Sequence, residues 1–198
     1  MRLLAFSDLH RDLGQAAALV EMSSAADVVV GAGDFASVHE GLAETIAALA
    51  AIEAPTVLVP GNNETVEALR DAASGWSAAT VLHGEGTNIE GVEFFGLGAG
   101  IPETPWDWSF DLDEEAATAM LAPCPQAPVL VLHSPPHGHC DDNGGGMHFG
   151  SRALLAAIKD KRPRLAVCGH IHESWGCESQ VGETPVHNLG PCGTWIEV

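Results

Sequence analysis

Seven side chains of metal-binding type follow short apolar runs along the chain. They are Asp8, His10, Asp34, Asn62, His133, His170 and His172. Carboxylate and amide oxygens together with imidazole nitrogens suit Mn, Fe or Zn, and such a mixed set can hold two adjacent cations when one carboxylate bridges them. The chemistry predicted for this set is hydrolysis, with a water molecule between or on the metals as the nucleophile.

Each of these residues has a simpler interpretation when it is taken alone. Asp8 and Asp34 could cap helices, Asn62 could form a turn, and a single His is commonly a surface or core residue. The whole pattern favours the metal site, because all seven residues lie at the ends of predicted strands. Open α/β sheets keep their sites at the carboxyl ends of their strands.

The elements expected to position these residues begin with an alternation of strands and helices. Apolar runs end at Asp8, Asp34 and Asn62, and helical spacing follows over residues 13–22, 38–52 and 64–73. This order implies a parallel sheet with crossover helices, since parallel neighbours need such connections.

The pattern changes after residue 79. Short runs over 80–83, 87–89 and 92–97, separated by Gly-containing turns, predict antiparallel strands, as do two final segments at 185–189 and 193–198. Between them we expect helices over 113–120 and 151–161 and strands ending at His133 and His170. Long irregular loops are expected over 98–111 and after His133, and such loops in a compact domain are usually functional.

The motifs resemble, in order and over nearly the whole chain, those of the calcineurin-like metallophosphoesterases. The family pattern is D-x-H, G-D, G-N-H-[DE], a lone His after an apolar run, and G-H-x-H. The chain has Asp8-Leu9-His10, Gly33-Asp34, Gly61-Asn62-Asn63-Glu64, His133 and Gly169-His170-Ile171-His172. The resemblance implies an α/β fold, a four-layer αββα sandwich of two mixed sheets flanked by helices. It also implies that one metal is held by Asp8, His10, Asp34 and His172 and the other by Asp34, Asn62, His133 and His170, with Asp34 as the bridge.

Asn63 departs from this pattern. In the family a His at this position lies beside the phosphate and is the favoured general acid for the leaving oxygen. An amide cannot donate a titratable proton, so Asn63 either hydrogen-bonds a phosphate oxygen or caps the helix that follows. The loops resemble the small phosphodiesterase-like branch of the family, in which residues beside the metals are sometimes replaced.

Three further residues are candidates for contact with a substrate. Arg11 is one of few cations available to a phosphate, although a surface salt bridge explains it equally well. His148 lies in the loop after His133 and could point at substrate. Trp106 could stack on a base or close over the site, whereas core packing is the more frequent fate of Trp.

The composition bounds the partners and the location of the protein. Asp and Glu number 27 against 8 Lys and Arg, and the resulting formal charge of -19 repels nucleic acid and anionic membranes. Five Cys without a C-x-x-C pair favour reduced thiols. No signal peptide or membrane-spanning run is recognised, so we expect a cytoplasmic protein that forms one domain over residues 1–198.

The leading hypothesis is a dinuclear metal-dependent phosphoesterase. It would hydrolyse small phosphodiesters or nucleotides, in preference to monoesters, by attack of a metal-bridging hydroxide. Manganese is the expected metal, with Fe, Zn or Mg as alternatives. A competing hypothesis is a catalytically weak, metal-dependent nucleotide-binding or scaffold protein of the same fold. Asn63 favours that alternative, and the seven presumed ligands oppose it.

Overall fold

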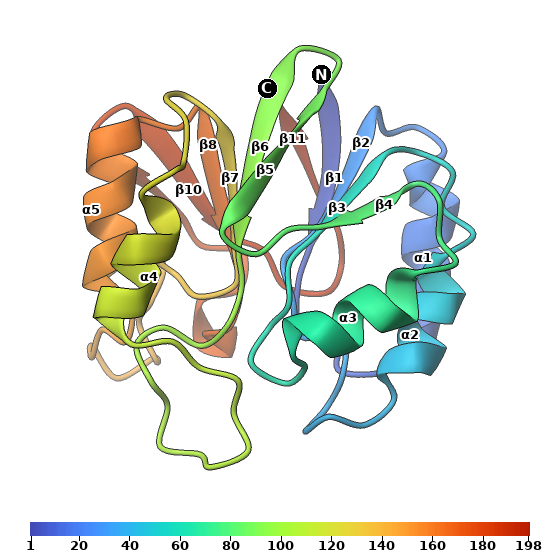
Figure 1. Ribbon diagram of the computed structural model, residues 1–198, viewed down its shortest axis with the longest axis horizontal. Helices are drawn as coiled ribbons and strands as arrows, with labels where there is room; N and C mark the ends of the chain where they lie inside the picture. The colour runs from blue at the N-terminus through green and yellow to red at the C-terminus, as the bar shows by residue number, and fades with distance from the viewer.

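The computed structural model describes residues 1–198 and contains two mixed β-sheets that face each other with helices outside (Figure 1). The five-stranded sheet has the order β11-β1-β2-β3-β4 and the six-stranded sheet the order β5-β6-β7-β8-β10-β9. The first sheet comprises β1 (Arg2–Phe6), β2 (Val28–Gly31), β3 (Thr56–Leu58), β4 (Ala79–Val81) and β11 (Thr194–Glu197). The second comprises β5 (Glu85–Ile89), β6 (Val92–Leu97), β7 (Val129–Leu132), β8 (Leu165–Cys168), β9 (Glu178–Val181) and β10 (Thr184–Asn188). The predicted four-layer α/β sandwich is therefore confirmed.

The two-residue alternation of the strands divides their side chains between two packing layers. Leu3 and Ala5 of β1 point into the layer between the sheets, where they meet residues such as Val131 of β7 and Val167 of β8. The intervening residues of β1, including Leu4, point outward against the helices. Because both faces of these strands are buried, they read as continuous apolar runs.

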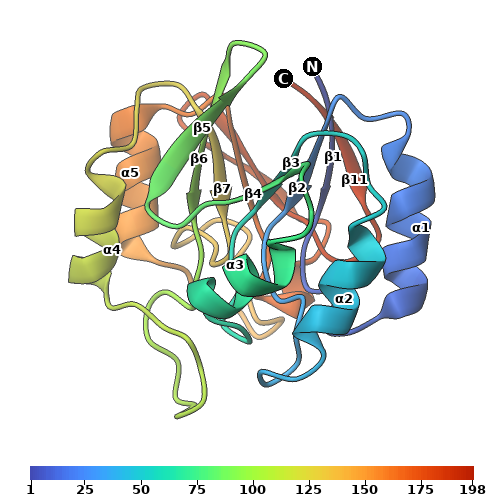
Figure 2. The same ribbon diagram turned by 45° about the vertical axis from the view of Figure 1, so that its right-hand side comes forward.

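Helices cover the outer face of each sheet (Figure 2). Helices α1 (Leu13–Ser23), α2 (Leu42–Leu49) and α3 (Val66–Ala73) pack on the first sheet through a cluster that includes Leu19, Ile46 and Leu69. Helices α4 (Glu114–Leu121) and α5 (Arg152–Lys161) pack on the second sheet through a cluster that includes Leu121 and Leu154. None of these helices is both long and apolar enough to cross a bilayer.

Two helices begin later than their periodicity predicts. The helix predicted from residue 38 begins at Leu42, because Val38 and His39 adopt the left-handed conformation with φ of 47° and 64°. The helix predicted from residue 64 begins at Val66, and its N-cap is Thr65, whose side chain accepts a hydrogen bond from the Ala68 amide. In both cases the residues before the helix belong to the loop that follows the preceding strand.

One predicted strand direction is wrong, and the other predicted antiparallel pairings are confirmed. β4 pairs in parallel with β3, so the predicted antiparallel direction at 80–83 is wrong. The antiparallel strand predicted over 185–189 is confirmed by the pairing of β10 with β9, although β10 also runs parallel to β8. The antiparallel hairpin of β5 and β6 is confirmed, as is the antiparallel pairing of β11 with β1. Strand pairing is decided by partners distant in sequence, which local patterns do not reveal.

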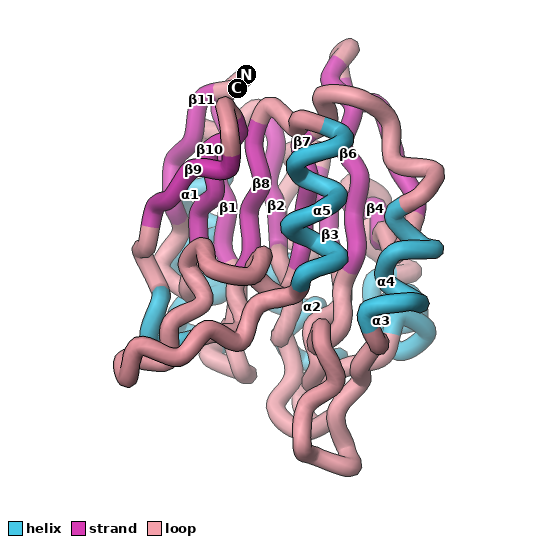
Figure 3. The backbone as a smooth tube through the Cα atoms, turned by 90° about the vertical axis from the view of Figure 1, so that its left-hand side faces the viewer, coloured by secondary structure: helices cyan, strands magenta, loops and turns pink.

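The loops that follow β1, β2, β3, β7 and β8 gather at one end of the molecule. The two chain termini lie at the opposite end (Figure 3). The fold therefore brings the strand ends singled out by the sequence to one edge of the sandwich.

Candidate metal centre

Backbone hydrogen bonds join the strand-end loops to one another. The Asp8 amide donates to the Gly33 carbonyl at 2.9 Å, and the His10 amide donates to the Asp34 carbonyl at 2.9 Å. Within the second sheet, the Gly169 amide donates to the His133 carbonyl at 2.9 Å, and between the sheets the Ser7 amide donates to the Gly190 carbonyl at 2.9 Å. These bonds hold the loops of the two sheets as one unit.

Four of the predicted metal residues have left-handed backbone conformations. Asp8, His10, Asp34 and His170 have φ of 55°, 43°, 57° and 67°. This region costs an L-residue about 1–2 kcal/mol. Such strain occurs preferentially at functional sites, where the surrounding structure holds it in place. Here it turns side chains at the ends of buried strands toward a common point.

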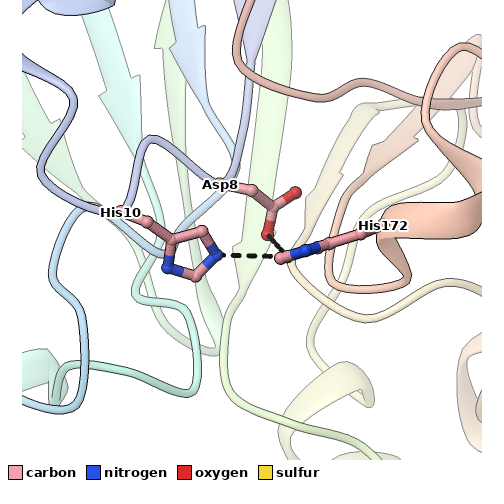
Figure 4. A group of neighbouring side chains, drawn as sticks. All are labelled: Asp8, His10 and His172. Carbon is pink, nitrogen blue, oxygen red and sulfur yellow. Dashed lines mark hydrogen bonds and ion pairs between the residues drawn. The ribbon is translucent and has the colours of Figure 1, made fainter.

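Asp8, His10 and His172 form the first group of neighbouring ligand atoms (Figure 4). The Nε2 atoms of His10 and His172 lie 3.1 Å apart, and His172 Nε2 lies 3.9 Å from Asp8 Oδ1. The ligand atoms of this group all lie within 4.8 Å of one another, a spacing that could hold one cation.

Asp34, Asn62, His133 and His170 form the second group. Asn62 Oδ1 lies 3.2 Å from His133 Nε2 and 3.1 Å from His170 Nδ1. Asp34 lies between the two groups, because its Oδ1 is 3.5 Å from His133 Nε2 and its Oδ2 is 3.6 Å from His10 Nε2. One carboxylate thus faces an imidazole of each group. The structure brings all seven sequence-predicted metal residues together.

The partners of the imidazole rings define which nitrogens face the centre. His10 Nδ1 lies 3.2 Å from the Ala36 carbonyl and His133 Nδ1 lies 2.8 Å from the Ala32 carbonyl. A carbonyl only accepts, so Nδ1 carries the proton in both rings and the Nε2 lone pair points inward. This arrangement is typical of metal-binding His, whose other nitrogen is held by a carbonyl or carboxylate.

The Asn62 amide is oriented in the same way. Its Nδ2 donates to Ser109 Oγ at 2.9 Å, and that hydroxyl in turn donates to Asp111 Oδ1 at 2.7 Å. The Oδ1 atom of Asn62 is therefore left to face the two imidazoles. Lone pairs from several residues therefore converge on one place, which fits a centre built for cations.

The pKa shifts of Asp34 and His170 also fit a centre that binds cations. Burial, and then the charge of Asp8, raise the pKa of Asp34 to about 7. Burial and the neighbouring imidazoles lower the pKa of His170 well below its ordinary value. A neutral imidazole at His170 beside the buried carboxylates provides a donor for a cation, which would compensate the carboxylate charge.

Glu64 supports the centre in a way that the sequence did not reveal. Its carboxylate is 1% exposed. It accepts hydrogen bonds from the amides of Gly61 at 2.7 Å, Asp34 at 2.8 Å and Ala36 at 2.9 Å. Glu64 thereby ties the loop after β2 to the loop after β3. Its acidic place in the Gly61–Glu64 motif was the available signal, but the helical pattern assigned it to a helix.

Trp175 also contacts the centre and was not predicted to do so. Its Nε1 donates to Asp8 Oδ2 at 3.0 Å, and its ring lies 4.3 Å from that of His172. Ser7 Oγ donates to the same Asp8 oxygen at 2.6 Å. These donors hold the carboxylate of Asp8 in place.

Asn63 does not cap the following helix, since Thr65 does. Its Nδ2 donates to Asp34 Oδ2 at 2.7 Å, and its Oδ1 accepts from the Val38 amide at 2.7 Å. The helix-cap interpretation is therefore wrong. Asn63 instead links the central carboxylate to the loop after β2, and it also lines the cavity beside the centre.

A cavity of about 570 Å³ opens beside the metal residues. Trp106, Trp108 and Phe149 form its aromatic wall, and Asn143 and Glu173 add polar groups. The rings of Trp106 and Trp108 stack with centroids 5.5 Å apart. No Lys or Arg lines the cavity.

The three predicted substrate residues have different positions. Trp106 lines the cavity and is 50% exposed, so it is not a core residue. Arg11 does not line the cavity, because it turns away and pairs with Glu40 at 3.1 Å. His148 does not line it either, since its Nδ1 pairs with the buried Asp141 at 2.7 Å. In the structure Arg11 thus forms a surface ion pair and His148 contacts a buried carboxylate, and neither lies where the predicted substrate contact would be.

The family comparison matches this geometry. The family model described as "Calcineurin-like phosphoesterase superfamily domain" matches residues 1–196. The chain belongs to this superfamily. The phosphoesterase is 30% identical over 201 residues to the protein MJ1162 of Methanocaldococcus jannaschii, covering 96% of this chain and 88% of the relative.

Solved structures share the fold of the phosphoesterase at low sequence identity. TT1561 of Thermus thermophilus superposes with a TM-score of 0.77 at 18% identity, over 96% of this chain and 90% of that chain. A dimetal phosphatase from Danio rerio superposes with a TM-score of 0.65 at 13% identity, over 97% of this chain and 88% of that chain. Family membership makes the protein a phosphoesterase, a metal-dependent hydrolase by class, with residues suited to metal binding at the expected place.

Proposed function

We propose that this phosphoesterase holds two divalent cations and hydrolyses small phosphodiesters or nucleotides. The observation on which this rests is the position of Asp34, whose two oxygens face imidazoles of two separate ligand groups at 3.6 and 3.5 Å. A single ion would leave several of the seven converging donors unused. The solved Danio rerio relative, described as a dimetal phosphatase, supports the same number of ions.

The proposed division of ligands follows the two groups. Asp8, His10 and His172 hold one cation, and Asn62, His133 and His170 hold the other, while Asp34 is shared. Bound divalent cations supply Lewis acidity, which lowers the pKa of water and compensates charge on the phosphoryl oxygens. The mixture of oxygen and nitrogen donors suits Mn, with Fe, Zn or Mg as alternatives.

The preference for a diester follows from the charge of the cavity. With no Lys or Arg in its lining, the cavity offers no protein cation to a phosphate dianion. A phosphodiester carries one negative charge where a monoester carries up to two, so the diester needs less compensation. Glu173 in the lining adds a further negative charge that disfavours extra phosphate groups.

The aromatic wall suits a flat substituent on the phosphate. Trp106 is half exposed beside the stacked ring of Trp108, so its free face can receive a base or an aryl ring. The net charge of -19 opposes the approach of long polyanions. A small nucleotide or aryl diester is therefore the proposed substrate class, in preference to DNA or RNA.

Asn63 favours a second candidate function. Both ends of its amide are already hydrogen-bonded within the protein, and neither supplies a titratable proton. A protein that lacks this acid could bind nucleotides through its metals with little turnover. The retained set of seven converging donors argues for hydrolysis, since binding alone does not require two activated sites.

Hydrolysis of bis(4-nitrophenyl) phosphate with added Mn distinguishes the two functions. We expect turnover by the native protein and loss of at least a hundredfold in Asp34→Asn, which affects both ligand groups. Asp71→Asn, an exposed residue of α3, is the matched control and should keep full activity. Calorimetry should show two Mn ions per chain. Saturation at one ion would contradict the dinuclear site, and two ions with no turnover would favour the binding protein.

A further inference from the structure

A second cavity lies at the other end of α5 from the candidate metal centre. It measures about 600 Å³ and is formed by the last turn of α5, the segment leading into β8 and the turn between β9 and β10. Arg164 precedes β8 and lines this cavity, whereas His170 follows β8. A strand rises about 3.3 Å per residue, so the four residues of β8 separate the two places by more than about 13 Å.

The lining of this cavity is positively charged in a strongly acidic protein. Lys159, Arg162 and Arg164 line it together with a single acidic residue, Glu183. All three cations are exposed. The sequence as a whole contains 27 acidic residues against 8 basic ones. A surplus of two positive charges around one concavity is thus opposite to the charge of the whole molecule.

None of the three cations of this cavity forms an ion pair with a carboxylate. Of the 8 Lys and Arg, three form ion pairs with carboxylates: Arg11, Arg70 and Lys161. Arg2 lies over the ring of Trp195. Arg152 also lacks an ion pair and lies at the opposite end of α5. With carboxylates in such excess, three unpaired cations around one cavity indicate a place for an external anion.

The end of the helix does not explain this arrangement by itself. Cations stabilise the last turn of a helix through its dipole, which accounts for Lys159. Arg164 lies beyond the helix, next to the start of β8. Arg162 is the C-cap in the left-handed conformation, with φ of 49°, where Gly is the preferred residue. A guanidinium group at 162 is therefore not required to end the helix, and the one at 164 lies outside it.

We propose that this cavity binds a compact anion with more than one phosphate charge, such as a pyrophosphate group. Guanidinium groups match phosphate oxygens in geometry as well as charge. The cavity volume is within the range of small-ligand sites. No aromatic residue lines it, so it offers no surface for stacking a base. The negative field of the remaining surface opposes long polyanions, which is why the ligand is compact.

Titration of sodium pyrophosphate into the full-length protein as purified, followed by amide NMR, tests the proposal. We expect saturable shifts at Gly182 and Glu183, in the turn that borders the cavity. The double variant Arg162→Gly/Arg164→Gln should weaken this binding at least tenfold. Gly suits the left-handed C-cap, so the helix end should remain intact. The matched control Arg2→Gln/Arg70→Gln removes the same charge elsewhere and should bind as the native protein does.

Three results would overturn the proposal. One is equal affinity of the native protein and the double variant, and another is a set of shifts confined to the metal centre around His172. The third is the absence of pyrophosphate shifts together with a native dimer that the double variant dissociates in sedimentation, which would assign this face to a second copy of the chain. If the double variant melts early by circular dichroism, Lys159→Gln replaces it and should show a smaller loss of affinity in the same direction.

Discussion

Replacement of Asn63 by His tests how the phosphoesterase treats the leaving group. Asn63 is 6% exposed, lines the cavity and donates to Asp34 at 2.7 Å, so it adjoins the carboxylate assigned to both metals. Because its amide cannot protonate a departing oxygen, turnover in the native protein should depend steeply on leaving-group acidity. A positioned acid contributes about 10²–10⁴-fold, which corresponds to about 3–5 kcal/mol of barrier.

The structure also sets a cost for this substitution. The two hydrogen bonds of the Asn63 side chain, to Asp34 and from the Val38 amide, each measure 2.7 Å. An imidazole cannot reproduce both, so the variant should lose about 1–3 kcal/mol of unfolding free energy. Asn63→Ala removes the same two bonds without adding an acid and is the matched control for this loss.

The assay is kcat/KM for aryl phosphodiesters of graded leaving-group pKa, measured with Mn for the native protein, Asn63→His and Asn63→Ala. We expect a shallower slope for Asn63→His alone, with the largest gain on the poorest leaving groups. Equal slopes for Asn63→His and Asn63→Ala would refute the reasoning, because they would place residue 63 away from the leaving oxygen.

Three further predictions concern Glu64 and Trp175 beside the centre and Glu114 at the start of α4. Glu64→Gln should lower the unfolding free energy in urea by about 2–3 kcal/mol, because NH₂ in place of one buried carboxylate oxygen leaves a backbone donor unpaired. A change below about 0.5 kcal/mol would contradict the role of Glu64. Trp175→Phe keeps the ring beside His172 but removes the donor to Asp8, and should weaken the binding of one Mn by about tenfold in calorimetry, as loss of such partners does. Unchanged affinity for both ions would show that this donor is dispensable. Burial opposes ionisation of Glu114, but hydrogen bonds from Ser151, Ala153 and Arg152 outweigh this effect and lower the pKa of the carboxyl group. The ionised Glu114 therefore stabilises the folded protein above about pH 4.5, the pKa in the unfolded chain, and this stabilisation is lost as the pH falls through the lower pKa of the folded protein. Glu114→Gln should therefore show a shallower acid loss of stability in urea titrations between about pH 3 and 6 than the native protein; identical slopes would mean that these bonds do not favour the charged form.

Local patterns in the sequence were sufficient for the candidate ligands and for an α/β chain with a parallel sheet, whereas the four-layer sandwich was implied by the family resemblance. Strands buried on both faces appear as continuous apolar runs, and their ends are marked by a change to Asp, His or Asn. Both signals lie within a few residues of each other, so no knowledge of distant contacts is needed to recognise them. The seven side chains recognised in this way do lie together in the folded protein.

Directions and partners depended on contacts between segments far apart in the sequence. β4 is parallel because it joins β3 at the edge of the first sheet, which its own residues do not specify. Asn63 and Glu64 look like the start of a helix, yet their side chains bond to a loop about 25–30 residues earlier. His148 was expected near substrate, but a buried carboxylate seven residues earlier draws it away.

The sequence by itself determined which atoms could bind cations and along which strands they lie, since residue type and periodicity are properties of the chain. Only the tertiary structure decided that the two oxygens of Asp34 face opposite imidazoles and that Glu64 and Trp175 hold the neighbouring groups in place. The reason is geometric. Ligand position depends on the packing of two sheets and on hydrogen bonds between their loops, and these are formed only when the chain is folded.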